Sequence, residues 1–192
     1  MTDWDKRYRA GEHINDEPHL LIPRFAVKFQ PGRALDLACG AGRHALWLAE
    51  HGWQVTAVDS SPAAIEILQQ KAQDRGVPVN GVLANLERHE FKIERGAYDL
   101  IIVVNYLQRD LLGAIRAGIR PRGAVIAVIA VVDDDPGVRP MNPEYLMRPG
   151  ELREEFPGWH LLHEFEGKPE GDLSRRATAE IVVQKNPDEI EN

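Results

Sequence analysis

The stretch that decides the fold reads Asp36-Leu37-Ala38-Cys39-Gly40-Ala41-Gly42-Arg43. An apolar run covers residues 33–38, and a helical pattern follows in which Ala45, Leu48 and Ala49 recur at i, i+3 and i+4. Small residues between a strand and a helix let the backbone approach a ligand closely, and the helix N-terminus behind them favours a negative group. The stretch therefore predicts a ligand-binding turn between a strand and a helix.

Beyond this turn, short apolar runs alternate with helical patterns. Ser61 and Pro62 are typical of a helix start, and the helical spacing that follows them continues to Gly76. Alternation of this kind predicts right-handed crossovers and a parallel sheet, and strands that are apolar throughout predict helices on both faces. The predicted parallel strands are Arg33–Ala38, Gln54–Val58, Val79–Leu83, Tyr98–Val104 and Ala124–Val132.

The pattern changes near the C-terminus. Residues 149–156 are predicted to form a short helix, followed by two strands, Trp159–Phe165 and Thr178–Gln184, with only a loop between them. Such a loop joins antiparallel neighbours, because a parallel pair needs a longer crossover. The predicted fold class is α/β, a doubly wound Rossmann-like sheet of five parallel strands plus a C-terminal antiparallel hairpin. We expect one domain over residues 1–192, with residues 186–192 as a frayed tail.

Composition excludes several classes of protein. The chain carries 23 Lys and Arg against 30 Asp and Glu, a net charge of −7 that argues against a nucleic-acid binder. Cys39 is the only cysteine, so no intramolecular disulfide forms and a reducing cytoplasm is expected. The longest apolar run, Ala124–Val132, is too short to span a membrane, and residues 1–5 lack an apolar signal core.

Two cofactor classes are compatible with the glycine turn. Gly40-x-Gly42-x-x-Ala45 also matches the dinucleotide fingerprint, and Asp59 ends the second strand, where an acidic residue accepts from ribose hydroxyls. Asp36 favours S-adenosylmethionine (SAM) over a nicotinamide cofactor. Its carboxylate would repel a pyrophosphate but suits a ligand that carries an ammonium and a sulfonium. We also expect no second domain after the fifth strand that would hold a dehydrogenase substrate.

The motif Asp36-x-Ala38-x-Gly40-x-Gly42 resembles the first motif of class I SAM-dependent methyltransferases, with Ala38 where that family usually has glycine. More closely, the chain resembles the small-molecule branch that includes tellurite-resistance and thiopurine methyltransferases. The segments Trp4–Tyr8, Leu35–Ser60 and Leu146–Leu152 carry this closer resemblance.

The resemblance implies roles for residues at the ends of the strands. Asp59 would bind both ribose hydroxyls, Ser60 would lie beside the adenine, and Asn85, where the family often has Asp, would meet the adenine edge. Pro121-Arg122-Gly123 resembles the family's Pro-Gly-Gly turn. The cofactor residues predicted in this way are Asp36, Ala38, Cys39, Gly40, Gly42, Arg43, Asp59, Ser60, Asn85, Leu86, Val104 and Asn105.

Candidates for the acceptor side follow the same strand ends. Tyr106 and Arg109 come after the fourth strand and are candidates to touch the substrate, the alternative being that Arg109-Asp110 only marks a helix start. The run Asp133–Asp135 is predicted as a solvated loop, with recognition of a cationic substrate as the alternative. Residues 1–17, which contain Tyr8, are predicted to form a lid over the cofactor, the alternative being a tail docked for burial alone.

The predicted reaction is transfer of the SAM methyl group to a small-molecule acceptor. No histidine has a catalytic arrangement or metal-ligand spacing, so we expect no metal and favour a soft acceptor, a thiol or a chalcogen oxyanion such as tellurite. The alternatives are a nicotinamide-dependent oxidoreductase and a non-catalytic SAM-binding protein. The sequence leaves the acceptor and the oligomeric state open.

Overall fold

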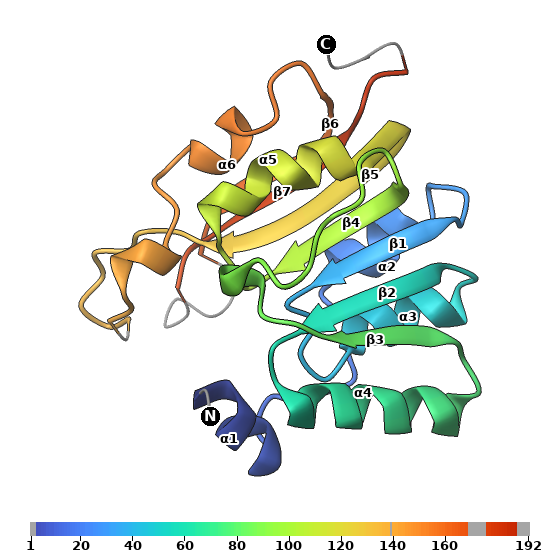
Figure 1. The fold of residues 1–192 in the computed structure, drawn as a ribbon. Coiled ribbons are helices and arrows are strands. Elements are labelled where there is room, and N and C mark those ends of the chain that lie inside the picture. Colours follow the sequence, from blue (N-terminus) through green and yellow to red (C-terminus); the bar gives the residue numbers. More distant parts are fainter. Residues whose placement is uncertain (1–2, 139, 169–175, 188–192) are drawn as a thin grey trace.

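The computed structural model describes residues 3–138, 140–168 and 176–187, which form one seven-stranded sheet flanked by helices (Figure 1). The strands are β1 (Arg33–Leu37), β2 (Gln54–Asp59), β3 (Val79–Leu83), β4 (Tyr98–Val104), β5 (Ile119–Ala130), β6 (His160–Gly167) and β7 (Thr178–Gln184). The helices are α1 (Asp3–Arg9), α2 (Leu21–Ala26), α3 (Arg43–Glu50), α4 (Pro62–Arg75), α5 (Arg109–Gly118) and α6 (Glu151–Glu154), with short 3-10 turns η1 (Leu86–Arg88) and η2 (Pro143–Tyr145).

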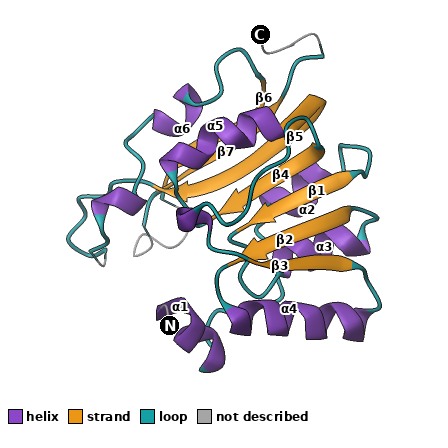
Figure 2. Ribbon diagram, viewed as in Figure 1, coloured by secondary structure: helices purple, strands orange, loops and turns teal. Residues whose placement is uncertain are grey.

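The strand order is β3-β2-β1-β4-β5-β7-β6. The first five strands are parallel, and β7 runs antiparallel to both β5 and β6. The order reverses between β1 and β4, and open α/β sheets bind ligands beyond the carboxyl ends of their strands at such a point. In Figure 2 the arrowheads of β1, β2 and β4 mark this carboxyl edge. The predicted fold class is confirmed.

Two apolar cores lie on opposite faces of the sheet. One packs α2, α3 and α4 against the strands, and the other packs α5 and the segment around α6. The edge strand β3 is only partly covered, because η1 replaces a full helix between β3 and β4. On that side Gln54, Thr56 and Asn80 line a hollow of about 450 Å³ at the amino-terminal ends of the strands.

Local signals placed α4 correctly. The Ser61 hydroxyl accepts from the Ala64 amide at 3.2 Å, Pro62 is the first helical residue, and Gly76 ends the helix at φ 66°. This arrangement is an N-cap at one end and a left-handed glycine at the other.

Several predicted boundaries were wrong. The first strand ends at Leu37, because Ala38 is left-handed at φ 53°. The fifth strand covers Ile119–Ala130 and so begins earlier than predicted. Ile119 pairs with Tyr98 of β4, and the Arg122 amide donates to the Lys185 carbonyl just after β7. The helix predicted at 149–156 is the single turn α6, and β6 starts and ends later than predicted. In the predicted tail, the Asn186 side chain donates to the Gly158 carbonyl at 2.7 Å, while residues 188–192 lie outside the described residues.

The N-terminal segment, for which the sequence predicts a lid or a docked tail, contains a helix that the sequence does not predict. Residues 3–9 form α1, which packs beside the start of α4 beyond the carboxyl edge (Figure 1). Within the described ranges, no helix has the length and apolar character needed to cross a membrane.

Candidate functional site

The glycine turn lies at the carboxyl end of β1 and holds three left-handed residues. Gly40 has φ 55°, Gly42 has φ 83° and Ala38 has φ 53°. A Cβ atom on Gly40 would lie 2.3 Å from the Tyr8 hydroxyl oxygen, and one on Gly42 would lie 2.2 Å from Leu68 Cδ1. Both positions therefore require glycine for space as well as for conformation. Ala38 adopts the same conformation with a methyl group, at a cost of about 1–2 kcal/mol.

Asp59 joins β2 to this turn. Its Oδ2 accepts from the Gly40 amide at 2.8 Å, and its Oδ1 accepts from the Ser61 amide at 2.9 Å. Burial raises the pKa of Asp59, and these backbone amides oppose the shift. A carboxylate has about four acceptor positions, so Asp59 retains capacity for further donors.

Asp36 is the least satisfied acid of the site. It is 1% exposed, and its Oδ2 has no hydrogen-bond partner among the described residues. Burial, together with the nearby charge of Asp59, raises its pKa to about 8. A buried carboxyl oxygen without a donor is costly unless a ligand supplies one. The atom therefore marks a place for a cationic or donor group.

Helix α1 covers the glycine turn. Asp5 is buried and accepts from the Ser61 hydroxyl at 2.9 Å and from the Ala63 amide at 3.0 Å, so it caps the start of α4. Arg9 also pairs with Asp5 at 2.9 Å. Tyr8 then lies with its hydroxyl over Gly40, where burial and the Asp59 charge raise its pKa. Sequence reasoning missed Asp5 because its partners are 56 and 58 residues away.

The other predicted cofactor residues lie along the same edge. Asn85 caps η1 by accepting from the Arg88 amide at 3.2 Å, and Leu86 is buried in the core. Asn105 has a left-handed backbone at φ 60°, and its backbone N–H donates to the Val128 carbonyl at 2.8 Å. Of the remaining predicted residues, Ser60 is exposed and Val104 is buried. Arg43 donates to Asn15 Oδ1 at 3.2 Å, and burial raises the pKa of the Cys39 thiol.

Of the predicted acceptor-side residues, Arg109 serves another purpose. Its guanidinium binds both carboxylate oxygens of Glu151, at 2.6 and 3.0 Å, and donates to the Leu146 carbonyl at 2.8 Å. It therefore clamps α5 to the segment before α6. Arg109 and Asp110 are also the first two residues of α5, as the helix-start alternative predicts. The hydrogen bond from Arg109 lowers the pKa of Glu151, which is 5% exposed, to about 2. Sequence reasoning missed Glu151. Tyr106 donates to Gln108 at 2.6 Å.

The acidic run after β5 is not simply solvated. Asp133 accepts from the Ala177 amide at 3.0 Å, and Lys168 binds Asp135 at 2.5 Å and Asp133 at 3.7 Å. The loop is thereby tied to the ends of β6 and β7.

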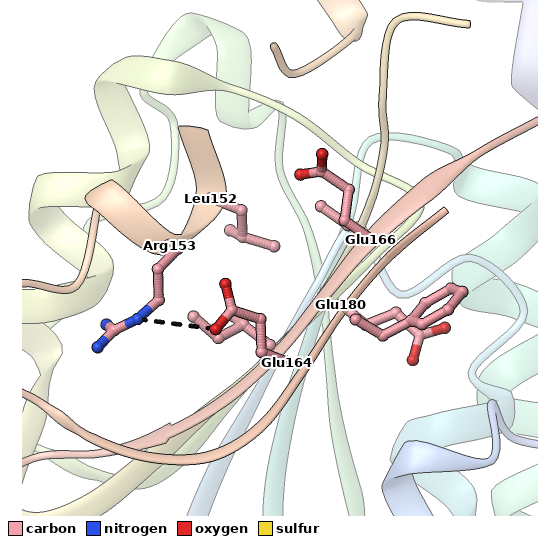
Figure 3. Close-up of a pocket in the computed structure, with 8 residues that line it drawn as sticks. Leu152, Arg153, Glu164, Glu166 and Glu180 are labelled. Atoms are coloured by element: carbon pink, nitrogen blue, oxygen red, sulfur yellow. Dashed lines mark ion pairs between the residues drawn. The ribbon is translucent and has the colours of Figure 1, made fainter. Parts of the chain in front are cut away.

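Two hollows of the surface lie away from the glycine turn. One is the hollow beside β2 and β3 described above. The other lies between α6 and the β6–β7 hairpin (Figure 3), where Arg153 pairs with Glu164 at 4.0 Å. Its volume is about 10 Å³, roughly the room that one water molecule needs. Neither hollow is lined by a residue of the glycine turn, so neither is assigned to the cofactor. Across the described ranges, no group of three or more His, Cys, Asp or Glu side chains could hold a metal ion.

Part of the chain is similar to a known protein family. The family described as "Methyltransferase domain" matches residues 34–123. Hemagglutinin 1 of Eikenella corrodens is 30% identical over 81% of this chain and 53% of its own length. The probable S-adenosyl-L-methionine-dependent methyltransferase TehB of Haemophilus influenzae is 24% identical over 69% of this chain and 47% of its own length. The chain thus spans about half the length of these curated relatives.

The crystal structure of TehB from Haemophilus influenzae superimposes with a TM-score of 0.76 at 21% identity, covering 95% of this chain and 67% of TehB. Residues 34–123 therefore match a methyltransferase domain, and the chain as a whole has the fold of TehB. In sequence it also resembles TehB, a probable SAM-dependent methyltransferase.

Proposed function

We propose that this chain transfers the methyl group of SAM to a small-molecule acceptor. The observation that carries the proposal is the buried Asp36 carboxyl group beside the glycine turn, with one oxygen unpartnered among the described residues. An ammonium group would supply the missing donor and stabilise the ionised form of Asp36.

The residues present fit SAM from end to end. Asp36 would accept from the ammonium, and the start of α3 at Arg43 would receive the carboxylate of the same moiety. Asp59 has acceptor capacity for the ribose hydroxyls. The adenine is assigned to Ser60, Asn85 and Leu86. The methionine end is assigned to Val104 and Asn105. The turn contacts the cofactor through its main chain, at Ala38, Cys39, Gly40 and Gly42. A pyrophosphate would instead meet two buried carboxyl groups, which disfavours the nicotinamide alternative.

When bound, SAM supplies a methyl group already activated on a sulfonium. The chain then has to hold two reactants in line and exclude water. We assign Tyr8 and α1, within a lid of residues 1–17, to covering the turn, and Tyr106 to the acceptor side. A soft acceptor, a thiol or a chalcogen oxyanion such as tellurite, needs no proton removal and is the starting class for assay.

We also propose that residues 1–192 act as a single domain in a reducing cytoplasm, without nucleic acid as a partner. The net charge of −7 and the single buried cysteine support this setting.

The proposal is tested by calorimetric titration of the full chain with SAM and with NAD, followed by product analysis with thiols, tellurite and amines. We expect SAM to bind and NAD not to compete. Methylated product from one acceptor class supports an enzyme. SAM binding without product from any class would favour a non-catalytic SAM-binding protein, and NAD binding would restore the oxidoreductase.

A further inference from the structure

Three ionisable side chains from distant parts of the chain meet on the α2–α3 face of the sheet. Glu180 of β7 lies with Oε2 3.1 Å from His163 Nε2 and with Oε1 3.7 Å from His19 Nε2. His163 belongs to β6, and His19 to the linker before α2. The surrounding face is otherwise a core of aliphatic and aromatic residues.

His44, in the first turn of α3, adds a second and independent observation. It is 5% exposed, and its Nε2 has no hydrogen-bond partner within the described part of the chain. Burial lowers its pKa to about 3, and the neighbouring charges of Arg43 and His19 add to the shift. His44 is therefore a neutral imidazole with one buried polar atom that lacks a partner among the described residues.

The strand register places this group near the cofactor turn. Glu180 pairs with Val128, and Val128 pairs with Val104 at the end of β4. Two strand spacings separate Glu180 from Val104, about 10 Å. His44 follows Gly42 by two positions. Glu180 pairs with Phe165, and Glu164 pairs with Ile181, so the side chains of Glu180 and Glu164 lie on opposite faces of the hairpin (Figure 3). The cluster thus lies at the carboxyl edge, on the β5–β7 side of the glycine turn.

We propose that His44, His19 and Glu180 form the acceptor subsite, and that it receives an acceptor bearing a hydrogen-bond-donating group, an ammonium or a thiol. The proposal rests on the proposed methyl transfer and narrows its acceptor. Three acids, Glu180, Asp36 and Asp59, lie around the subsite, and His44 is neutral. The nearby cations are engaged: Arg43 binds Asn15 and the Glu17 carbonyl, and His19 pairs with Glu180. Such a site attracts a cation or a neutral donor and repels an oxyanion. It therefore favours an amino thiol over tellurite.

Each member of the subsite has a defined part. The unused Nε2 of His44 is an open hydrogen-bonding position for the acceptor. Glu180 keeps acceptor capacity beyond its two histidine contacts, because a carboxylate has about four acceptor positions. The ring of His163 packs on Phe25 of α2 with ring centres 5.5 Å apart, and its Nε2 contacts Glu180, which fixes the position of that carboxylate. His163 and Phe25 are positioning residues.

The test uses the full chain with isotope-labelled histidines, saturated with S-adenosylhomocysteine and titrated with cysteamine. Histidine resonances are recorded by NMR, with tellurite as the anionic comparison and exposed His51 and His89 as internal controls. We expect saturable shifts of His19 and His44 with cysteamine and none with tellurite. In Glu180→Gln the cysteamine affinity should fall about tenfold or more. In the matched control Glu164→Gln, on the opposite face of the hairpin, it should stay unchanged.

Absence of a saturable shift with cysteamine overturns the subsite, as does a stronger response to tellurite or an equal loss in the two glutamate variants. The wild-type titration needs no substitution, so a variant that fails to fold leaves the test intact. If the chain binds no SAM at all, it is the proposed function that fails. Normal SAM binding with unmoved histidines removes only the acceptor subsite.

Discussion

The two halves of the carboxyl edge are held together by different kinds of contact. On the β1–β2 side, carboxylates are bound by backbone amides: Asp59 accepts from Gly40 and Ser61, and Asp5 accepts from Ala63. On the β5–β7 side, side chains pair with side chains, such as Arg109 with Glu151 and His163 with Glu180. Backbone amides thus hold the acids of the glycine turn, whereas pairs of long side chains join the distant segments of the other half, alongside backbone contacts such as that of Asp133 with Ala177.

This difference has consequences for binding. A backbone amide has no rotamer to lose, so the first half presents a preorganised surface suited to one invariant ligand. The second half depends on long, titratable side chains and can be altered by single substitutions without changing the sheet. We therefore expect the cofactor half to tolerate little change, and the acceptor half to carry the specificity.

The largest expected effect is the pH dependence of SAM binding through Asp36. Its pKa in the free protein is raised to about 8, so the carboxyl is neutral below that pH and ionised above it. SAM brings an ammonium, which binds the ionised form. Affinity should therefore rise with pH between about 6 and 8, by up to roughly tenfold per unit, and then level off. Calorimetry across this range checks it, and a flat profile for wild type would contradict it. Asp36→Asn should abolish the dependence.

The next effect is loss of the cofactor in Asp59→Ala. Hydrogen bonds to a charged acceptor are worth about 1.5–3 kcal/mol each, so SAM affinity should fall roughly tenfold to a hundredfold. Asp99 is the matched control, because it also accepts from a backbone amide, that of Arg33 at 2.7 Å, but at the opposite edge of the sheet. Asp99→Ala should lower the melting temperature and leave SAM affinity unchanged. Equal affinity losses would remove Asp59 from the site.

The acceptor half should respond in stability rather than in cofactor affinity. Glu151 has a folded-state pKa of about 2 against an ordinary 4.5. Because the folded pKa is depressed, its stabilising contribution is complete above about pH 4.5 and is lost as pH falls toward 2. Glu151→Gln should lower the melting temperature at pH 7 by roughly 3–10 °C. Its difference from wild type should shrink as the solution is acidified below pH 4.5. A difference in melting temperature that does not change with pH would contradict the role given to the Glu151 carboxylate. A change in SAM affinity would contradict the separation of the acceptor half from the cofactor half.

The smallest effect should come from Tyr8→Phe, which removes one hydroxyl over Gly40 and keeps the ring. If the Tyr8 hydroxyl bonds to the cofactor, this change removes one neutral hydrogen bond, worth about 0.5–1.5 kcal/mol. SAM affinity should therefore fall by about two- to tenfold, with an unchanged melting temperature. Asp5→Ala provides the contrast, since losing the cap of α4 should cost about 1 kcal/mol of stability. If Tyr8→Phe binds SAM and turns over normally, α1 covers the turn for packing alone.

Prediction from sequence succeeded where the signal is local. β3, β4 and β7 have the predicted bounds because short β-branched runs between breakers carry their own strand signal. Ser61 and Gly76 fixed α4 because a cap acts within a few residues. Helix α1 was missed because seven residues form no stable helix alone. It exists through Asp5 and its distant contacts with the start of α4.

The candidate site divides in the same way. The sequence by itself determined the glycine turn, the acid that precedes it and the acid that ends the second strand, because each sits at a strand end whose position follows from hydrophobic periodicity. Only the tertiary structure decided that Asp36 is left with an unpartnered oxygen, that Arg109 clamps Glu151, and that His19 and His163 meet at Glu180. Burial and contact between residues far apart along the chain set hydrogen-bond partners and pKa values, and no local pattern records which distant side chain will supply them.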